Sequence, residues 1–262
     1  MVEIIAIEEK FPSSSAGAFV ALAEDGDYWV VKAKNIVASG KRLFNSFVAG
    51  KLAELFQVSH PETTLVRLDR KIIDELNEQH YQIGVGKRYI SNFSRVEPPD
   101  ADFNSKQFPI INREHLKGVF GQDYHFQQFY NFWAFSEWIH LEDDFKYENL
   151  YQTTSGAPLF LDLDFAFEGR EWNALPNTYE GLKMSPHAPF LEGIFSDIRK
   201  FDPFFKRLFQ LSRNDFFSIT SQIPQSWSVP SGYLQNIHSL LFKKRDKFQA
   251  EFMYAAERYL EI

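Results

Sequence analysis

The first part of the chain alternates between short apolar runs and polar turns. Residues Glu3–Ile7 alternate weakly, and two apolar runs, Phe19–Ala23 and Tyr28–Ala33, are separated by a short acidic turn. That turn contains Asp25-Gly26, and an Asp-Gly pair between apolar runs is a strong hairpin signal. The pattern therefore predicts two or three antiparallel strands, with Lys32 near the end of the last one.

A helical pattern follows this hairpin, because apolar residues recur on one face over residues 39–56. His60-Pro61 ends that region. Further strands are predicted over Thr63–Leu68 and Tyr81–Tyr89, on either side of a polar helix or loop. Residues 1–90 are therefore predicted to form a small antiparallel sheet with one helix.

The remainder of the chain has a different pattern. Residues 91–112 are irregular and rich in proline, as expected of a connection between two units. Tyr124–Ile139 carries aromatic residues on nearly every side, which predicts a helix that is buried all round. A mainly helical part follows, and it ends in an amphipathic helix over Ser231–Leu260. The predicted class is α+β, with one domain over residues 1–90 and a larger helical domain over 91–262.

Composition and charge narrow the class of protein. Hydrophobic residues make up 44% of the chain, which favours a globular protein over a disordered one. The net charge of -7, without a long basic run, makes nucleic acid a poor candidate partner. Cysteine is absent, which excludes disulfides and thiolate-bound metal centres. The N-terminus lacks the basic start of a signal peptide, and no run approaches the ~20 apolar residues that cross a bilayer, so we expect a soluble cytoplasmic protein without a membrane partner.

The acidic residues between positions 142 and 164 carry the main chemical signal. Asp144 and Asn149 are five residues apart, an interval that matches the catalytic loop of a phosphotransferase, in which the acid takes the acceptor's proton and the amide binds Mg²⁺. Asp162 follows a predicted strand over Pro158–Leu161, and a divalent ion bridging nucleotide phosphates would compensate a carboxylate there. Asp164 shares a strand face with Asp162 if the strand continues, so either could be the principal metal ligand.

Two features nearer the N-terminus complete this predicted site. Lys32 ends the apolar run Tyr28–Lys32 and could pair with the phosphates of ATP. Pro12–Phe19 contains small residues that allow backbone N–H groups to approach phosphate, although it lacks a glycine-rich motif and could be a plain turn. Each residue alone has a simpler explanation: a strand-end lysine with its ammonium in water, a solvated acidic turn, or a carboxylate that caps a turn at Asp162. The order of the features along the chain favours the phosphotransferase site.

Taken in order, the segments YWVVKAKN, YQIGVGKRYI, DDFKYEN and PLFLDLDFAF, together with the tail IPQSW, resemble the HipA-like family of bacterial kinases. The resemblance covers residues 17–252, approximately. It implies a two-lobed protein-kinase-like fold, a small antiparallel-sheet N-lobe and a larger helical C-lobe, that binds ATP and Mg²⁺. Lys32 would anchor phosphate and Asp144 would be the catalytic base. Asn149 and Asp162, with Asp164 as the alternative, would hold the metal.

The resemblance assigns two further groups of residues. The hinge that faces adenine would be the segment containing Val85, Lys87 and Tyr89. Longer members of the family phosphorylate a serine in the phosphate-facing loop, where this chain has Ser13, Ser14 and Ser15. The chain begins close to the nucleotide-binding strands, without the additional N-terminal segment of the toxin members, so the toxin role is not expected of it.

One position departs from the family pattern. Asn45-Ser46 stands where these kinases have Asn-Glu, so the acid expected to pair with Lys32 is absent. Glu54 lies ~12 Å further along the helix and about 80° round it, which makes it a poor replacement. Asn45 or an acid from the second domain could take the role. A nucleotide-binding pseudokinase is therefore the main alternative to an active kinase acting on a hydroxyl, most simply a protein serine or threonine; a glycosidase with paired carboxylates explains neither Lys32 nor Asn149.

Overall fold

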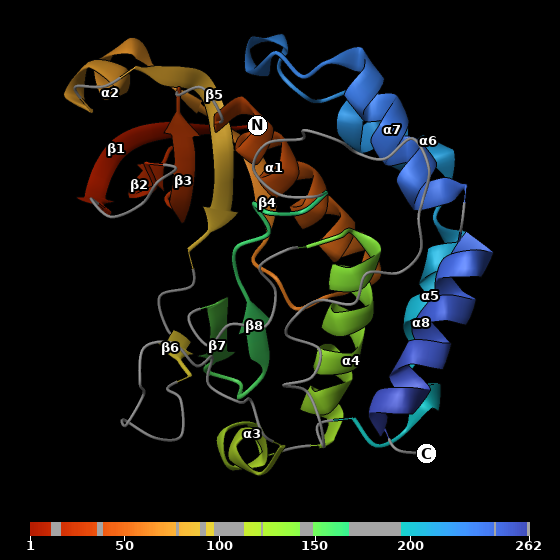
Figure 1. The fold of residues 1–262 in the computed structure, drawn as a ribbon. Coiled ribbons are helices and arrows are strands. Elements are labelled where there is room, and N and C mark those ends of the chain that lie inside the picture. The colour runs from red at the N-terminus through yellow and green to blue at the C-terminus, as the bar shows by residue number, and fades with distance from the viewer. Residues whose placement is uncertain are drawn as a thin grey trace, which may run out of the picture.

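Five strands near the N-terminus close into a small barrel (Figure 1). In the computed structural model of the protein, the described residues are 1–11, 17–35, 39–76, 79–89, 93–96, 113–121, 123–141, 149–167, 195–243 and 245–260. The barrel strands are β1 (Val2–Lys10), β2 (Phe19–Ala23), β3 (Tyr28–Lys34), β4 (Thr63–Leu68) and β5 (His80–Arg88). Their order is β1-β2-β3-β5-β4, closed by a parallel pairing of β1 with β4. The predicted hairpin joins β2 to β3, and Gly26 takes the positive φ that its turn requires.

The two faces of the barrel strands pack against different cores. Val31 and Ala33 point into the barrel with Val66, where a small apolar cluster fills the interior. Leu65 and Val85 point outward and join the main core of the protein. Because side chains alternate along a strand, Lys32 and Val85, which are register partners, both point out of the barrel. The outer face of β3 and β5 is therefore where a site can form.

Helix α1 (Ser39–Phe56) links the barrel to the rest of the protein. It contacts β4 on one side and α4 and α5 on the other. A short helix, α2 (Arg70–Glu75), begins at Asp69, whose side chain caps the backbone N–H of Ile72. Of the two alternatives expected between the strands, a polar helix or a loop, the structure has the helix.

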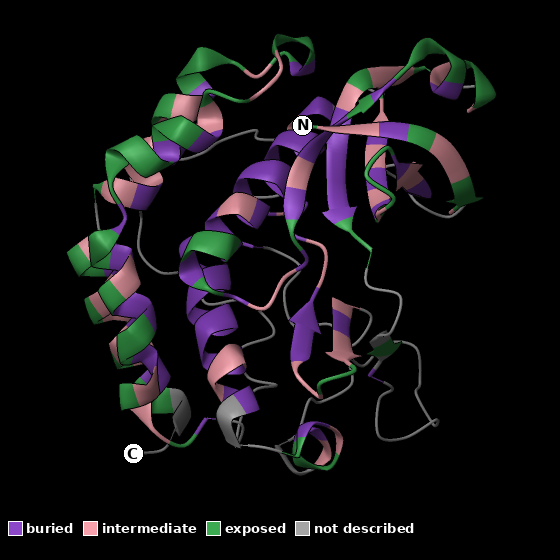
Figure 2. Ribbon diagram, turned by 180° about the vertical axis from the view of Figure 1, so that it is seen from behind, coloured by how far each residue is buried: buried purple, intermediate pink, exposed green. Residues whose placement is uncertain are grey.

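The remaining elements are a small sheet and a group of helices. The sheet consists of β6 (Phe93–Arg95), β7 (Leu150–Thr153) and β8 (Pro158–Phe160), paired antiparallel in that order. The helices are α3 (Arg113–Phe120), α4 (Asp123–Trp138), α5 (Asp202–Gln210), α6 (Arg213–Thr220), α7 (Ser231–Phe242) and α8 (Arg245–Leu260), with 3₁₀ turns at Ile198–Phe201 and Gln225–Trp227. Figure 2 shows that α4 is buried along most of its length, as predicted, whereas α5 to α8 expose their outer faces.

Three expectations from the sequence need correction. The N-terminal sheet is a closed barrel with one parallel pair, and not a wholly antiparallel sheet. Strand β6 lies inside the stretch expected to be irregular throughout. The single helix expected over Ser231–Leu260 is divided into α7 and α8, where Arg245 stacks on Phe242 and donates to the Leu211 carbonyl at 2.7 Å. Among the described helices, none combines the length and apolarity needed to cross a membrane.

A close approach between β5 and β3 makes Gly84 sensitive to substitution. A Cβ atom at this position would lie 2.6 Å from the Lys32 carbonyl oxygen and 2.8 Å from the Ala33 Cβ. We expect Gly84→Ala to lower the free energy of unfolding by about 1–3 kcal/mol, because β3 would have to shift. Urea unfolding measures this, with Gly118→Ala as control, since a Cβ at Gly118 meets nothing within 4 Å. Equal unfolding midpoints for the two variants would contradict the expected strain.

Candidate functional site

Charged side chains from distant parts of the chain meet where the barrel faces the segment after β8. The Lys32 Nζ atom lies 3.1 Å from the Asp162 Oδ1 atom and 2.5 Å from the Asp164 Oδ2 atom. The Lys32 and Asp164 side chains are largely buried, with 14% and 5% of their surfaces exposed, and the Asp162 side chain is 38% exposed. The structure thus brings together three of the predicted site residues.

The position of the two aspartates follows from the packing of β8. Phe160, the last residue of β8, stacks on Phe132 of α4 with ring centroids 3.9 Å apart. Its N–H donates to the Ser59 carbonyl at 2.9 Å. The chain then leaves the strand, because Asp162 has a φ of 58°, a left-handed conformation that aspartate tolerates better than most residues other than glycine. Asp164 therefore reaches Lys32 from a turn, because the strand does not continue beyond Phe160, and the condition for a shared strand face with Asp162 is not met.

The ion pairs set the charge state of these groups. Burial alone would lower the pKa of Lys32, but attraction to Asp162 and Asp164 outweighs it and raises that pKa above its usual value. Burial alone would raise the pKa of Asp162, but Lys32 and then Lys87 outweigh it and lower that pKa. Lys32 and Asp162 are therefore both ionised at neutral pH.

Asn45 holds the turn that carries Asp164. Its side-chain amide donates to the carbonyl oxygens of Asp164 at 3.1 Å and Ala166 at 2.8 Å. Ser46 is completely buried, and its Oγ atom has no hydrogen-bond partner in the described part of the chain. The acids that pair with Lys32 thus come from the second half of the chain. An acid from the second domain was one of the two replacements expected for the missing glutamate.

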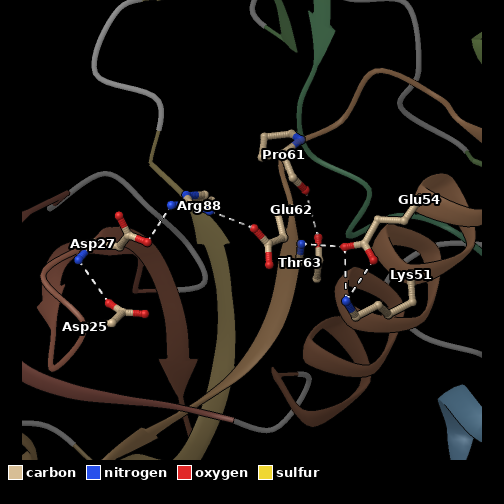
Figure 3. Close-up of polar contacts among 8 residues, drawn as sticks. All are labelled: Asp25, Asp27, Lys51, Glu54, Pro61, Glu62, Thr63 and Arg88. Atoms are coloured by element: carbon tan, nitrogen blue, oxygen red, sulfur yellow. Dashed lines mark hydrogen bonds and ion pairs between the residues drawn. The ribbon is translucent and has the colours of Figure 1, made fainter.

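Glu54 has a separate structural role, which Figure 3 shows. Its carboxylate accepts hydrogen bonds from Lys51 at 2.8 Å and from the backbone N–H of Thr63 at 2.8 Å, so it ties α1 to the start of β4. In the same view, Arg88 at the end of β5 pairs with Asp27 and Glu62. These contacts fix the ends of three strands, and Glu54 does not replace the absent partner of Lys32.

The predicted hinge residues differ in their surroundings. Val85 is buried in the main core, and Tyr89 is partly exposed, with its N–H donating to the Tyr28 carbonyl at 2.8 Å. Lys87 is only 7% exposed. Burial, followed by repulsion from Lys32, lowers the pKa of Lys87 to about 8, although Asp164 and Asp162 oppose this shift. Lys87 therefore belongs to the same group of charges as Lys32.

Sequence reasoning did not identify His60, which lies in the loop between α1 and β4. Its Nδ1 atom is 2.8 Å from the Phe160 carbonyl oxygen, and its Nε2 atom is buried without a partner in the described residues. Burial, followed by repulsion from Lys87, lowers the pKa of His60 well below 6.5. The only signal in the sequence was His60-Pro61, which indicated the end of a helix and nothing about chemistry. We call Lys32, His60, Lys87, Asp162 and Asp164 the junction cluster.

Asn149 lies close to this cluster through the pairing of β7 with β8. The Asn149 carbonyl accepts a hydrogen bond from the Leu161 N–H at 2.9 Å, so its backbone lies beside the residue that precedes Asp162. The remaining predicted site residues, Asp144 and Ser13, Ser14 and Ser15, lie outside the described residues.

The oxygen atoms of the junction cluster suit a hard divalent cation. The Asp164 Oδ1 atom is buried and has no hydrogen-bond partner among the described residues, and Asp162 offers a second carboxylate. The described residues contain no group of three or more His, Cys, Asp or Glu side chains suited to a metal. Two carboxylates are nevertheless oxygen donors of the kind that Mg²⁺ accepts, because Mg²⁺ retains several water ligands.

An open polar hollow of about 750 Å³ lies elsewhere, lined by residues of α2, β5 and their flanks. Its side chains are mostly exposed, and Arg70 pairs with Asp74 across one turn of α2 at 3.0 Å. None of the junction cluster lines this hollow. The hollow is therefore separate from the buried charges of the candidate site.

Comparison with solved structures identifies the fold as protein-kinase-like. The crystal structure of the Helicobacter pylori proinflammatory kinase CtkA matches with a TM-score of 0.59 and 12% identity, covering 100% of this chain and 98% of that chain. Two structures of the Golgi casein kinase, one with Mn and ADP bound, match at 9% identity with TM-scores of 0.45 and 0.46. They cover 96% of this chain and 72% and 71% of theirs, and their scores are too low to support an argument.

Comparison with family models gives a match over the first part of the chain. The HipA-like kinase family model matches residues 4–129, which confirms the resemblance found in the sequence. This part of the chain includes Lys32, His60 and Lys87, and it ends before Asp162 and Asp164. Among curated proteins, no sequence matched the chain. The family and the fold together support a kinase-type phosphotransfer function.

Proposed function

We propose that this protein is an ATP- and Mg²⁺-dependent kinase that transfers the γ-phosphoryl group to a hydroxyl acceptor, with a protein serine or threonine as the first acceptor to test. The observation that supports it is the convergence of Lys32 with Asp162 and Asp164, from elements 130 and 132 residues apart in the sequence. A kinase site needs a lysine for the phosphates of a nucleoside triphosphate and carboxylates for the metal ion, and both kinds of group lie together at this position. In this proposal residues 1–90 and 91–262 form the two lobes around the nucleotide.

Each residue of the site then has a distinct task. Lys32 leaves the carboxylates and holds the phosphates, and Asp162 and Asp164, with Asn149, hold the metal. The Mg²⁺ ion supplies charge neutralisation on the phosphate oxygens. Asp144 accepts the proton of the acceptor hydroxyl as the new oxygen–phosphorus bond forms and the bond to the β-phosphate oxygen breaks, leaving ADP. Asn45 positions the Asp164 turn through its two carbonyl contacts.

The test separates binding from turnover. We expect Mg²⁺-ATP to stabilise the protein against heat by about 2.7 kcal/mol when ATP is present at a hundred times its dissociation constant. We expect γ-labelled ATP to label an acceptor protein or the chain itself. Asp144→Ala should keep the thermal stabilisation and reduce transfer by about 10²- to 10⁴-fold, because it removes the general base.

A matched control is available in the neighbouring acid, since Asp143→Ala should leave both properties unchanged. Stabilisation by Mg²⁺-ATP without any transfer would favour the alternative of a nucleotide-binding scaffold, for which the buried Ser46 in place of an acid is the motivating feature. No stabilisation by any Mg²⁺-nucleotide would overturn both functions.

A further inference from the structure

Three polar atoms of the junction cluster have no hydrogen-bond partner in the described part of the chain: the Asp164 Oδ1 atom, which faces the proposed metal site, and two nitrogen atoms. One of these nitrogen atoms is the His60 Nε2 atom. The other is the Lys87 ammonium group, for which the described residues provide no hydrogen bond or ion pair although only 7% of the residue is exposed. Most buried polar groups in native proteins are hydrogen-bonded, so a buried Nε2 atom without a partner, near a largely buried ammonium group, points to a ligand.

The tautomer of His60 follows from its other contact. A carbonyl oxygen only accepts hydrogen bonds, so the 2.8 Å contact with the Phe160 carbonyl requires a hydrogen on Nδ1. Burial and the nearby Lys87 keep the ring neutral, as its lowered pKa reflects. The Nε2 atom is then an acceptor only, whereas the Lys87 ammonium group is a donor only. Together they offer one donor and one acceptor.

The strand register places this pair beside the proposed phosphate site. Lys87 pairs with Val30 of β3 and with Thr63 of β4, and Thr63 is three residues after His60. Val85, the register partner of Lys32, is two residues before Lys87 on the same face of β5. Lys87 therefore lies about 7 Å along the strand from the partner of Lys32. A nucleotide whose phosphates contact Lys32 has its base or ribose within reach of Lys87.

The local charges favour a neutral ligand over an anion at the pair formed by Lys87 and His60. Lys32 and Lys87 are balanced by Asp162 and Asp164, whose charges act on both lysines. An anion placed between Lys87 and His60 would also face the Nε2 lone pair. A neutral group that carries an acceptor next to a donor fits better, because it satisfies both side chains without adding charge.

We propose that Lys87 and His60 recognise the polar edge of a purine base, with Lys87 donating to a ring or carbonyl acceptor and His60 Nε2 accepting from an adjacent N–H. Adenine offers N1 and the 6-amino group, and guanine offers O6 and N1–H. This inference rests on the proposed nucleotide-binding function and adds a specificity determinant to it. It assigns base selectivity to two side chains in addition to any hinge backbone contacts.

The experiment measures dissociation constants by calorimetry for the full chain with Mg²⁺. The ligands are ATP, GTP, their analogues without the donor (purine riboside triphosphate and N1-methyl-GTP), and tripolyphosphate. The variants are Lys87→Met, which removes the donor, and His60→Asn, whose amide can still donate to the Phe160 carbonyl but lacks the Nε2 acceptor. Thermal unfolding of each variant shows that it is folded.

We expect the wild-type protein to bind ATP or GTP about 2- to 13-fold more tightly than the matching analogue. In His60→Asn, the nucleotide and its analogue should have equal dissociation constants. Lys87→Met should weaken nucleotide binding by about 10-fold or more, because it removes a charge-assisted bond, and leave tripolyphosphate binding unchanged. The nucleotide that the wild-type protein binds more tightly than its analogue identifies whether the site recognises adenine or guanine.

Four results would overturn the inference. An unchanged analogue ratio in His60→Asn would mean that the pair is structural. An equal loss for tripolyphosphate in Lys87→Met would make Lys87 a phosphate contact. If the wild-type protein binds no Mg²⁺-nucleotide, the proposed function fails together with this inference, whereas nucleotide binding without base discrimination overturns the inference alone.

Discussion

Replacing Lys32 with methionine should destabilise the protein by about 3–5 kcal/mol at neutral pH. Lys32 neutralises Asp162 and Asp164 at 3.1 Å and 2.5 Å, and the Asp164 side chain is almost completely buried. Removing one partner of a buried ion pair leaves an uncompensated charge in a medium of low polarity. Lys87 remains close to both carboxylates and partly compensates their charge, so we expect a loss toward the lower end of this range. Urea unfolding at pH 7 measures the loss.

The loss should diminish in acid, and the direction follows from the pKa of Asp162. That pKa is lower in the folded protein than its unfolded value of 3.8, so the ion pair contributes stability above pH 3.8 that disappears as the pH falls further. Lys32, with its raised pKa, stays protonated throughout this range. The difference between the wild-type protein and Lys32→Met should therefore become smaller below about pH 4.

Arg67→Met is a suitable control, because Arg67 pairs with Glu3 at 3.1 Å but both side chains are exposed. Exposed ion pairs contribute about 0–1 kcal/mol, so this variant should stay near the wild-type stability at every pH. If the two variants lose the same free energy, the pairing of Lys32 with the aspartates does not exist in solution.

Local sequence patterns predicted most of the elements that carry the site. The Asp25-Gly26 turn, the helix at residues 39–56 and the strand Thr63–Leu68 lie where the sequence placed them, because turn chemistry and periodicity act over a few residues. Closure of the barrel was not predictable in this way. The parallel pairing of Val2 with Val66 joins residues far apart in the sequence, and no local signal encodes that register.

The site itself was predicted in part, for a similar reason. Lys32, Asp162 and Asp164 were identified because charged residues next to apolar runs require compensation. The structure shows that they compensate one another, which no local pattern reveals. His60 was not identified, because the neighbours that make it unusual, Lys87 and the Phe160 carbonyl, come from other elements. Burial of a titratable group is a property of the tertiary structure, and a single sequence does not reveal it.

The largest expected effect on activity is that of Asp162→Asn. We expect it to reduce Mg²⁺-dependent phosphoryl transfer by about a thousandfold or more, since a metal ion stabilises the transition state by several kcal/mol and each 1.36 kcal/mol is a factor of ten. The fold should persist, because Lys32 keeps its contact with Asp164 at 2.5 Å and Asn45 still holds the turn. Transfer of label from γ-labelled ATP and Mn²⁺ binding by electron paramagnetic resonance measure the two consequences.

Asp164→Asn distinguishes which carboxylate is the principal metal ligand. Asp162 is the more exposed of the two and has the positive φ, whereas Asp164 has a buried Oδ1 atom without a partner among the described residues. If Asp162→Asn retains transfer and Mn²⁺ binding while Asp164→Asn loses both, the ligand role moves to Asp164. Asp197→Asn is the control, because Asp197 pairs only with the exposed Arg199 among the described ion pairs and should change neither readout. If Asp162→Asn and Asp164→Asn both behave like this control, these carboxylates hold no metal, and the proposed metal-dependent kinase mechanism is wrong.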